Sequence, residues 1–159
     1  MMNHRVAIAL LLLVAGCSRP HVSPLLPPPY RAEFSASYEK VWGGLIQALA
    51  HENTPLRAVA KDSGVIASDD IATPIGVYAD CGRFGDRGVE GQALVSFTLF
   101  VRSVDGGRTQ VQINSKMLTE LYGWDSMGGA IKPRSPLICS STGRWEANLF
   151  DAVRRLVGE

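Results

Sequence analysis

Residues 93–117 have the sequence ALVSFTLFVRSVDGGRTQVQINSKM, in which apolar and polar side chains alternate on both sides of a short turn. The positions expected to share the buried face are Val95, Phe97, Leu99 and Val101 before the turn, and Thr109, Val111, Ile113 and Met117 after it. Phe100 is an apolar exception on the opposite face. Asp105-Gly106-Gly107 supplies the turn. The alternation predicts a β-hairpin in an antiparallel sheet with one buried and one wetter face.

Two amphipathic helices are predicted, one before and one after the strands. The first covers residues 37–51, with Ser35 or Ser37 as its cap. The second begins near Thr142 or Gly143 and continues to Val157, and Glu146 can complete a capping box. Apolar residues at three- and four-residue steps form their stripes: Val41, Trp42, Leu45, Ile46 and Leu49 in the first helix, and Trp145, Leu149, Val153 and Leu156 in the second.

Three shorter strands precede the hairpin in this prediction. They cover residues 56–61, 65–68 and 75–81, the first two separated by the turn Asp62-Ser63-Gly64. Residues 82–91 are expected to form a loop, and residues 120–141 a long irregular segment. The predicted order is therefore helix, about five strands, helix. This order indicates an α+β two-layer sandwich, with an antiparallel sheet of about five strands covered by an N-terminal and a C-terminal helix, in a single domain at residues 34–159.

The first seventeen residues have the features of an export signal. A positive start at His4 and Arg5 precedes an unbroken apolar run from Val6 to Val14, which is too short for a permanent membrane span. Ala15-Gly16-Cys17 ends the run and resembles the lipobox of bacterial lipoproteins. The resemblance implies a signal peptide at residues 1–16 and a diacylglycerol and an acyl chain on Cys17. The alternative is an ordinary signal peptide cleaved nearby, with Cys17 incidental.

The lipobox resemblance also implies a location. Ser18 follows the lipidated cysteine, whereas Asp at this place tends to retain lipoproteins of enteric bacteria at the inner membrane. We therefore expect an outer-membrane lipoprotein whose domain faces the periplasm. Residues 17–33 hold five prolines after Cys17, and this composition predicts an extended linker that could hold the domain about 40 Å from its anchor. A disordered tail of no tuned length is the alternative.

Cysteine content and charge restrict the class of protein further. Cys81 and Cys139 remain as an even pair once Cys17 is lipidated, and in an exported chain such a pair favours a disulfide over two free thiols. Arg5 is one of sixteen basic residues against fifteen acidic ones, so the chain without its signal has no net formal charge. We therefore expect no nucleic-acid partner, because such a partner would require a basic surface.

Two further stretches resemble envelope lipoproteins. Tyr38-Glu39-Lys40-Val41-Trp42, with Leu45 and Leu49 and then Lys61-Asp62-Ser63-Gly64-Val65-Ile66, resembles the helix-then-hairpin opening of BamC-type domains. Residues 139–146, Cys-Ser-Ser-Thr-Gly-Arg-Trp-Glu, resemble the end of small bacterial lipoproteins. These resemblances imply a helix-grip-like fold in an envelope lipoprotein.

Catalytic motifs are scarce in the sequence. His51 is the only histidine in the expected domain, and no Cys-x-x-Cys, Gly-x-Ser-x-Gly or paired-histidine metal motif occurs. A thiol nucleophile would require His51 beside Cys81 or Cys139. Asp69-Asp70 could be a carboxylate pair, but neighbouring residues of a strand face opposite sides, which favours a solvated strand end. We expect a protein that is not an enzyme and that has neither metal nor cofactor beyond its lipid.

Residues 120–141 are the better candidate for function. Long loops in compact domains often bind partners, and Tyr122, Trp124 and Met127 are residue types favoured at interface cores. Alternatively, these side chains cover one end of the sheet. The leading hypothesis is a non-catalytic lipoprotein whose periplasmic domain binds another envelope component. A carrier of a small apolar ligand in a helix-grip cavity and a thiol-dependent envelope enzyme are the alternatives.

Overall fold

The computed structural model describes residues 21–120, 123–124, 130–131 and 136–159. In these residues the chain is mixed α/β, with two α-helices and an antiparallel sheet-rich core. The strands and helices are β1 (His21–Val22), β2 (Tyr30–Phe34), α2 (Tyr38–His51), β3 (Leu56–Ala60), β4 (Val65–Ser68), β5 (Ile71–Pro74), β6 (Ala79–Asp80), β7 (Arg83–Phe84), β8 (Arg87–Gly88), β9 (Gln92–Val104), β10 (Arg108–Thr119), β11 (Gly123–Trp124), β12 (Ala130–Ile131), β13 (Leu137–Ser141) and α3 (Arg144–Val157).

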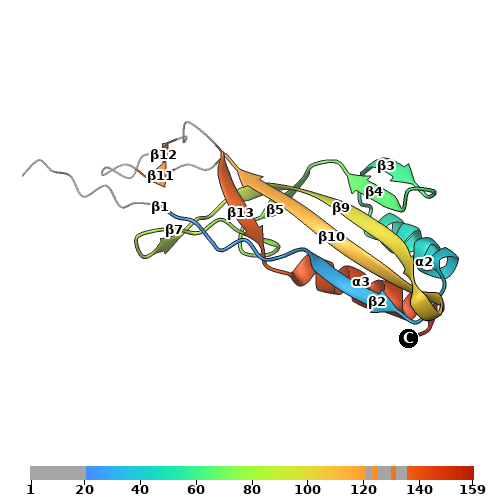
Figure 1. The fold of residues 1–159 in the computed structure, drawn as a ribbon. Helices are drawn as coiled ribbons and strands as arrows, with labels where there is room; N and C mark the ends of the chain where they lie inside the picture. The colour runs from blue at the N-terminus through green and yellow to red at the C-terminus, as the bar shows by residue number, and fades with distance from the viewer. Residues whose placement is uncertain (1–20, 121–122, 125–129, 132–135) are drawn as a thin grey trace, which may run out of the picture.

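The predicted hairpin is the centre of the fold. β9 and β10 pair antiparallel from Val104 opposite Arg108 to Leu94 opposite Leu118, around the turn at Asp105–Gly107. The main sheet has eight strands in the order β3-β4-β9-β10-β13-β6, with β5 also on β9 and β2 also on β10. The two long strands therefore serve as the template on which the short strands assemble (Figure 1).

Both helices cover one face of this sheet, which we call the inner face (Figure 1). The alternate residues of β9 and β10 that the sequence assigned to the buried face are buried there with the apolar stripes of α2 and α3. Phe34 of β2 also lies in this core, with its ring centroid 6.2 Å from that of Phe150 in α3. The opposite side of the sheet, the outer face, carries the intervening residues of the same strands.

The sheet is larger than the five strands predicted. Residues 75–81 do not form the single strand expected: β5 ends before them at Pro74, a turn occupies residues 76–78, and β6 is short. β13 lies inside the segment expected to be irregular, and β2 lies at the end of the proline-rich stretch. β2, β6 and β13 are too short for their alternation to be recognised locally, and they form here because each pairs with a neighbour distant in sequence.

The helix predictions are close to the structure. α2 begins one position after Ser37, whose side chain makes no capping hydrogen bond. α3 begins after Gly143, which adopts a left-handed conformation with φ of 81°. In its stripe, Val157 is buried and Leu156 is exposed, because the helix turns Val157 toward Gly44 of α2. Glu146 does not complete a capping box; it is buried and accepts hydrogen bonds from serine side chains of β10 and β13.

The proline-rich stretch differs from an extended linker at two places. β1 pairs with β7, so residues 21–22 lie against the body of the protein. β2 pairs with β10 over five positions, from Tyr30 opposite Ile113 to Phe34 opposite Thr109. Ala32 and Phe34 are buried under α3, and this burial of apolar surface favours strand pairing directly after the prolines. Residues 30–33 therefore belong to the folded sheet.

Candidate functional site

Of the residues predicted for lipidation and partner binding, the structure describes only one. Cys17, Tyr122 and Met127 lie outside the residues that the structure describes. Trp124 is described as part of β11, where its backbone pairs with that of Ala130 in β12. Figure 1 places β11 and β12 at the end of the body where β13 begins. The prediction that these residues bind a partner therefore stays a prediction.

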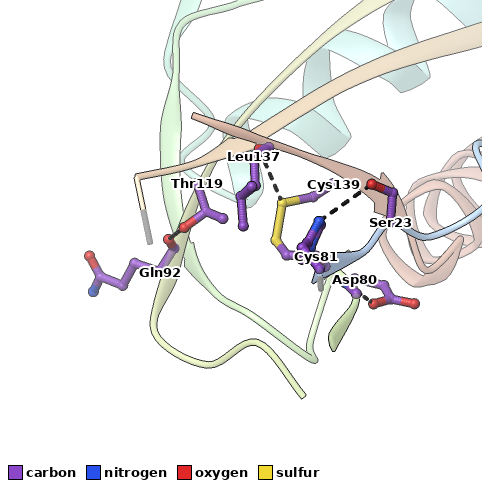
Figure 2. The surroundings of a disulfide bond; sticks show 9 residues. Ser23, Asp80, Cys81, Gln92, Thr119, Leu137 and Cys139 are labelled. Carbon is purple, nitrogen blue, oxygen red and sulfur yellow. Dashed lines mark hydrogen bonds between the residues drawn. A yellow bond between two sulfur atoms is a disulfide. The ribbon is translucent and has the colours of Figure 1, made fainter. Parts of the chain in front are cut away.

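The predicted pairing of Cys81 and Cys139 is present as a disulfide. Both residues are buried, with Cα atoms 4.1 Å apart, and they join β13 to the end of β6 (Figure 2). Two backbone pairs link the same strands, Ser140 with Asp80 and Ser141 with Ala79. Because both sulfur atoms are in the bond, neither residue carries a thiolate in this state.

An apolar row crosses the outer face of the sheet near the disulfide. It consists of Ala72 on β5, Leu94 on β9, Leu118 on β10 and Ile138 on β13, each directly opposite the next in the strand register. Leu94 is 48% exposed and Ile138 is 60% exposed, although both are large apolar side chains. Directly opposed side chains are close enough to form one surface, so this apolar row is a continuous patch across four strands.

The other half of the outer face is mostly polar, with Phe100, which is 42% exposed, as its apolar exception. Toward the β9–β10 turn, Arg102 donates two hydrogen bonds to Gln110, at 3.0 and 2.7 Å. Arg108 donates to Glu33 of β2 at 2.6 Å, and Arg31 donates to Gln112 at 2.9 Å. This network is what a solvated sheet face normally carries. The apolar row therefore marks one end of the outer face as different from ordinary exposed surface.

A buried carboxylate lies beneath the inner face of the sheet. Glu146 of α3 is fully buried and accepts hydrogen bonds from Ser115 Oγ at 2.6 Å and Ser141 Oγ at 2.8 Å. Ser141 Oγ also accepts the backbone N–H of Gly143 at 3.0 Å, which satisfies one donor at the start of α3. The arrangement fixes α3 to β10 and β13, which is a structural role.

A pocket of about 190 Å³ lies where β2 and β13 diverge from β10. Pro27, Pro28 and Pro29 line it together with Ser115 and Ser141. The remaining lining residues are Leu26, Tyr30, Ile113, Asn114, Cys139 and Ser140. Neither helix contributes to its lining, so this pocket is not the cavity between sheet and α3 that a helix-grip carrier would need.

The other candidates for chemistry are dispersed on the surface. His51 ends α2 and is exposed, as are Asp69 and Asp70 between β4 and β5. Among the described residues, no group of three or more His, Cys, Asp or Glu side chains could hold a metal ion. Neither described helix has the length and apolarity needed to cross a membrane.

Two ionisable groups near the start of α2 have altered proton affinities. Glu39 accepts a hydrogen bond from Lys61 and thereby raises the pKa of that ammonium group. Partial burial, followed by the charge of Glu39, raises the pKa of Tyr38, whose hydroxyl donates to the carbonyl oxygen of Lys61. These contacts tie α2 to the turn between β3 and β4, and they suggest no catalytic role.

The sequence prediction missed the apolar row. Leu94 and Leu118 occupy outer-face positions that resemble isolated exceptions, as Phe100 does, when each strand is considered alone. Their alignment with Ala72 and Ile138 depends on the register of four strands. The available signal in the sequence was Ile138 next to Cys139: if residues 137–141 form a strand, these two side chains lie on opposite faces of the sheet. That signal required recognition of β13 as a strand.

Comparisons with known proteins give distant structural likenesses to solved structures. No protein-family model matches the sequence, and no curated protein matches it. Among solved structures, the fold is similar to the crystal structure of a DUF4468 family protein from Bacteroides ovatus, with a TM-score of 0.44 and 12% sequence identity over 86% of this chain and 91% of that chain. At this distance the likeness carries no argument about function.

Proposed function

We propose that this protein is a non-catalytic outer-membrane lipoprotein whose periplasmic domain binds another envelope protein through the outer face of its sheet. The lipobox-like Ala15-Gly16-Cys17 supplies the anchor, and the disulfide between Cys81 and Cys139 suits an oxidising compartment outside the cytoplasm. In this proposal the two helices and the sheet are an enlarged variant of a helix-grip-like domain.

The apolar row is the observation that supports binding. Leu94 and Ile138 would each lose exposed apolar surface to a partner, and burial of such surface is the main favourable contribution to association. The polar network around Arg102 and Gln110 would remain in solvent at the rim. The row is uncharged, so the expected partner presents an apolar surface rather than a charged one.

The carrier and the thiol enzyme have less support. The described pocket is bounded by the proline stretch and not by the helices, and both described cysteines are in the disulfide. Neither alternative explains why the exposed Leu94 and Ile138 belong to one apolar row across four strands.

The test is photo-crosslinking in living cells, with a benzophenone amino acid replacing Leu94, Ile138 or Trp124. A discrete adduct of protein size at Leu94 and Ile138 is expected, and mass spectrometry would identify its partner. The matched control is the same substitution at Arg102, which is exposed on the outer face of the same strand as Leu94. Absence of a discrete adduct at both row positions, or the same adduct at Arg102, would refute docking at the apolar row.

A further inference from the structure

β1 is held against the body of the protein. His21 and Val22 pair with Phe84 and Arg83 of β7, and the His21 ring lies 4.9 Å from that of Phe84. His21 Nε2 donates to the carbonyl oxygen of Cys81 at 2.8 Å, which joins β1 to the disulfide region. The side chain of Ser23 also bonds to the other ring nitrogen of His21 at 3.4 Å (Figure 2).

The proline stretch then follows the body of the protein instead of leaving it. Pro27, Pro28 and Pro29 line the same pocket as Ser115 and Ser141. The next residue, Tyr30, begins β2. The segment from β1 to β2 is therefore attached at both ends and cannot act as a free spacer while these contacts hold.

This attachment changes how far the domain can lie from its anchor. Only four residue steps separate Cys17 from His21, and at about 3.3–3.6 Å per residue they reach no more than about 14 Å. An unattached linker over residues 18–33 would allow about 40 Å. If Cys17 carries lipid, the end of the body that contains β1 and β7 must stay beside the membrane surface. Figure 1 shows α2 and the C-terminus at the opposite end.

We propose that the three-stranded sheet β1-β7-β8 is a membrane-facing surface that rests on the phospholipid headgroup layer. This inference rests on the lipid anchor of the proposed function. It adds a second binding surface, with lipid as its partner, at the end of the molecule that contains β1.

The chemistry of this surface fits phospholipid. Val22 is 47% exposed and lies directly opposite Arg83, which is also exposed, while Leu25 is 94% exposed. Arg87 on β8 is also exposed, but it lies opposite Phe84, so its side chain extends from the other face of this small sheet. Arginine side chains bind phosphate oxygens in a bidentate manner, and apolar side chains enter the boundary between headgroups and acyl chains. A lipid anchor with one such patch gives two membrane signals in place of one.

The orientation can be measured in the full lipidated protein, reconstituted into vesicles of phosphatidylethanolamine and phosphatidylglycerol. A fluorescent amino acid is placed at Gly88 of β8 or at Gly43 of α2, and a lipid with a spin-labelled headgroup serves as the quencher. The two sites match because an added side chain meets no atom within 4 Å at either glycine. We expect at least threefold stronger quenching at Gly88 than at Gly43.

A release variant tests whether β1 causes the orientation. A Cβ at Gly82 would lie 2.0 Å from the carbonyl oxygen of Val22, so Gly82→Ala should displace β1. Quenching at Gly88 should then fall to the level at Gly43. If Gly82→Ala does not fold, as judged by circular dichroism, His21→Ala removes the bond to Cys81 instead and should give the same direction of change.

Intact mass separates the two proposals. If the protein carries a diacylglycerol and an acyl chain but the two sites are quenched equally, the membrane-facing surface is refuted and the anchor stands. If quenching at Gly88 stays strong in Gly82→Ala, the attachment of β1 does not cause the orientation, and that part of the inference is refuted. If the intact mass shows no lipid on Cys17, so that it matches the unmodified mass of the Cys17→Ser control apart from the substitution, both the anchor and this inference fail.

Discussion

Reduction of the disulfide is the perturbation whose size follows most directly from the structure. Cys81 and Cys139 are 58 positions apart in sequence. In the chain-entropy model, a cross-link that closes a loop of this length restricts the unfolded chain enough to stabilise the fold by about 4 kcal/mol. At a urea dependence of about 2 kcal/mol per molar, the unfolding midpoint should fall by about 2 M when the bond is absent.

The assay compares oxidised and reduced forms of one chain. Urea titration of a Cys17→Ser variant, followed by circular dichroism, gives both midpoints without a third thiol. The reduced sample is unfolded in reductant and refolded with reductant present, so that no side chain in the core is substituted. Coincident midpoints would contradict the reasoning, because the loop closed by the bond would then not restrict the unfolded chain.

The structure also indicates where reduction acts first. β13 pairs with β10 only from Met117 to Thr119, and with β6 through two residue pairs. The β9–β10 hairpin has much longer pairing. Hydrogen exchange should therefore accelerate at β13 and β6 in the reduced protein while the hairpin amides stay protected. Uniform acceleration across all strands would contradict this local role.

Three further predictions concern Glu146, Gly64 and Lys61. Glu146→Ala should lower the free energy of unfolding by about 3 kcal/mol, because two serine hydroxyls lose a buried acceptor, and Glu146→Gln should cost less in the same urea titration. Gly64→Ala should lower the free energy of unfolding by at least about 2 kcal/mol, because its Cβ would lie 2.0 Å from a backbone oxygen at a φ of +67°. Gly43→Ala, on the open face of α2, should instead raise the free energy of unfolding by about 1 kcal/mol. Equal shifts of the two melting temperatures would contradict this reasoning. The ammonium group of Lys61 binds its proton more tightly in the folded protein, so its contribution to stability is complete below pH 10.5 and is lost as the pH rises through its higher folded pKa. In Glu39→Gln, an NMR titration should find the pKa of Lys61 nearer 10.5.

Regular local patterns predicted the centre of the fold. The alternation in residues 93–117 is carried by neighbouring residues around one turn, so the hairpin requires no knowledge of the rest of the chain. The apolar stripes of α2 and α3 recur within a few residues for the same reason. Cys81 and Cys139 were predicted to pair because they are the even pair of an exported chain.

The candidate surfaces were decided only by the tertiary structure. The apolar row aligns Leu94 with Leu118 and Ile138 because three strands share one register, and that register depends on pairing energies between residues far apart in sequence. The position of Glu146 near the expected start of the second helix predicted a capping box, but the packing of α3 under β10 buries it beside Ser115.

The N-terminal stretch separates the two kinds of information most clearly. Its lipobox-like residues and prolines are sequence features, and they predict an exported, anchored chain with an extended segment after Cys17. The attachment of that segment depends on contacts of β1 with residues about sixty positions away. Proline restricts the local backbone but does not specify what the chain packs against, so only the folded protein determines how close the domain would lie to the proposed anchor at Cys17.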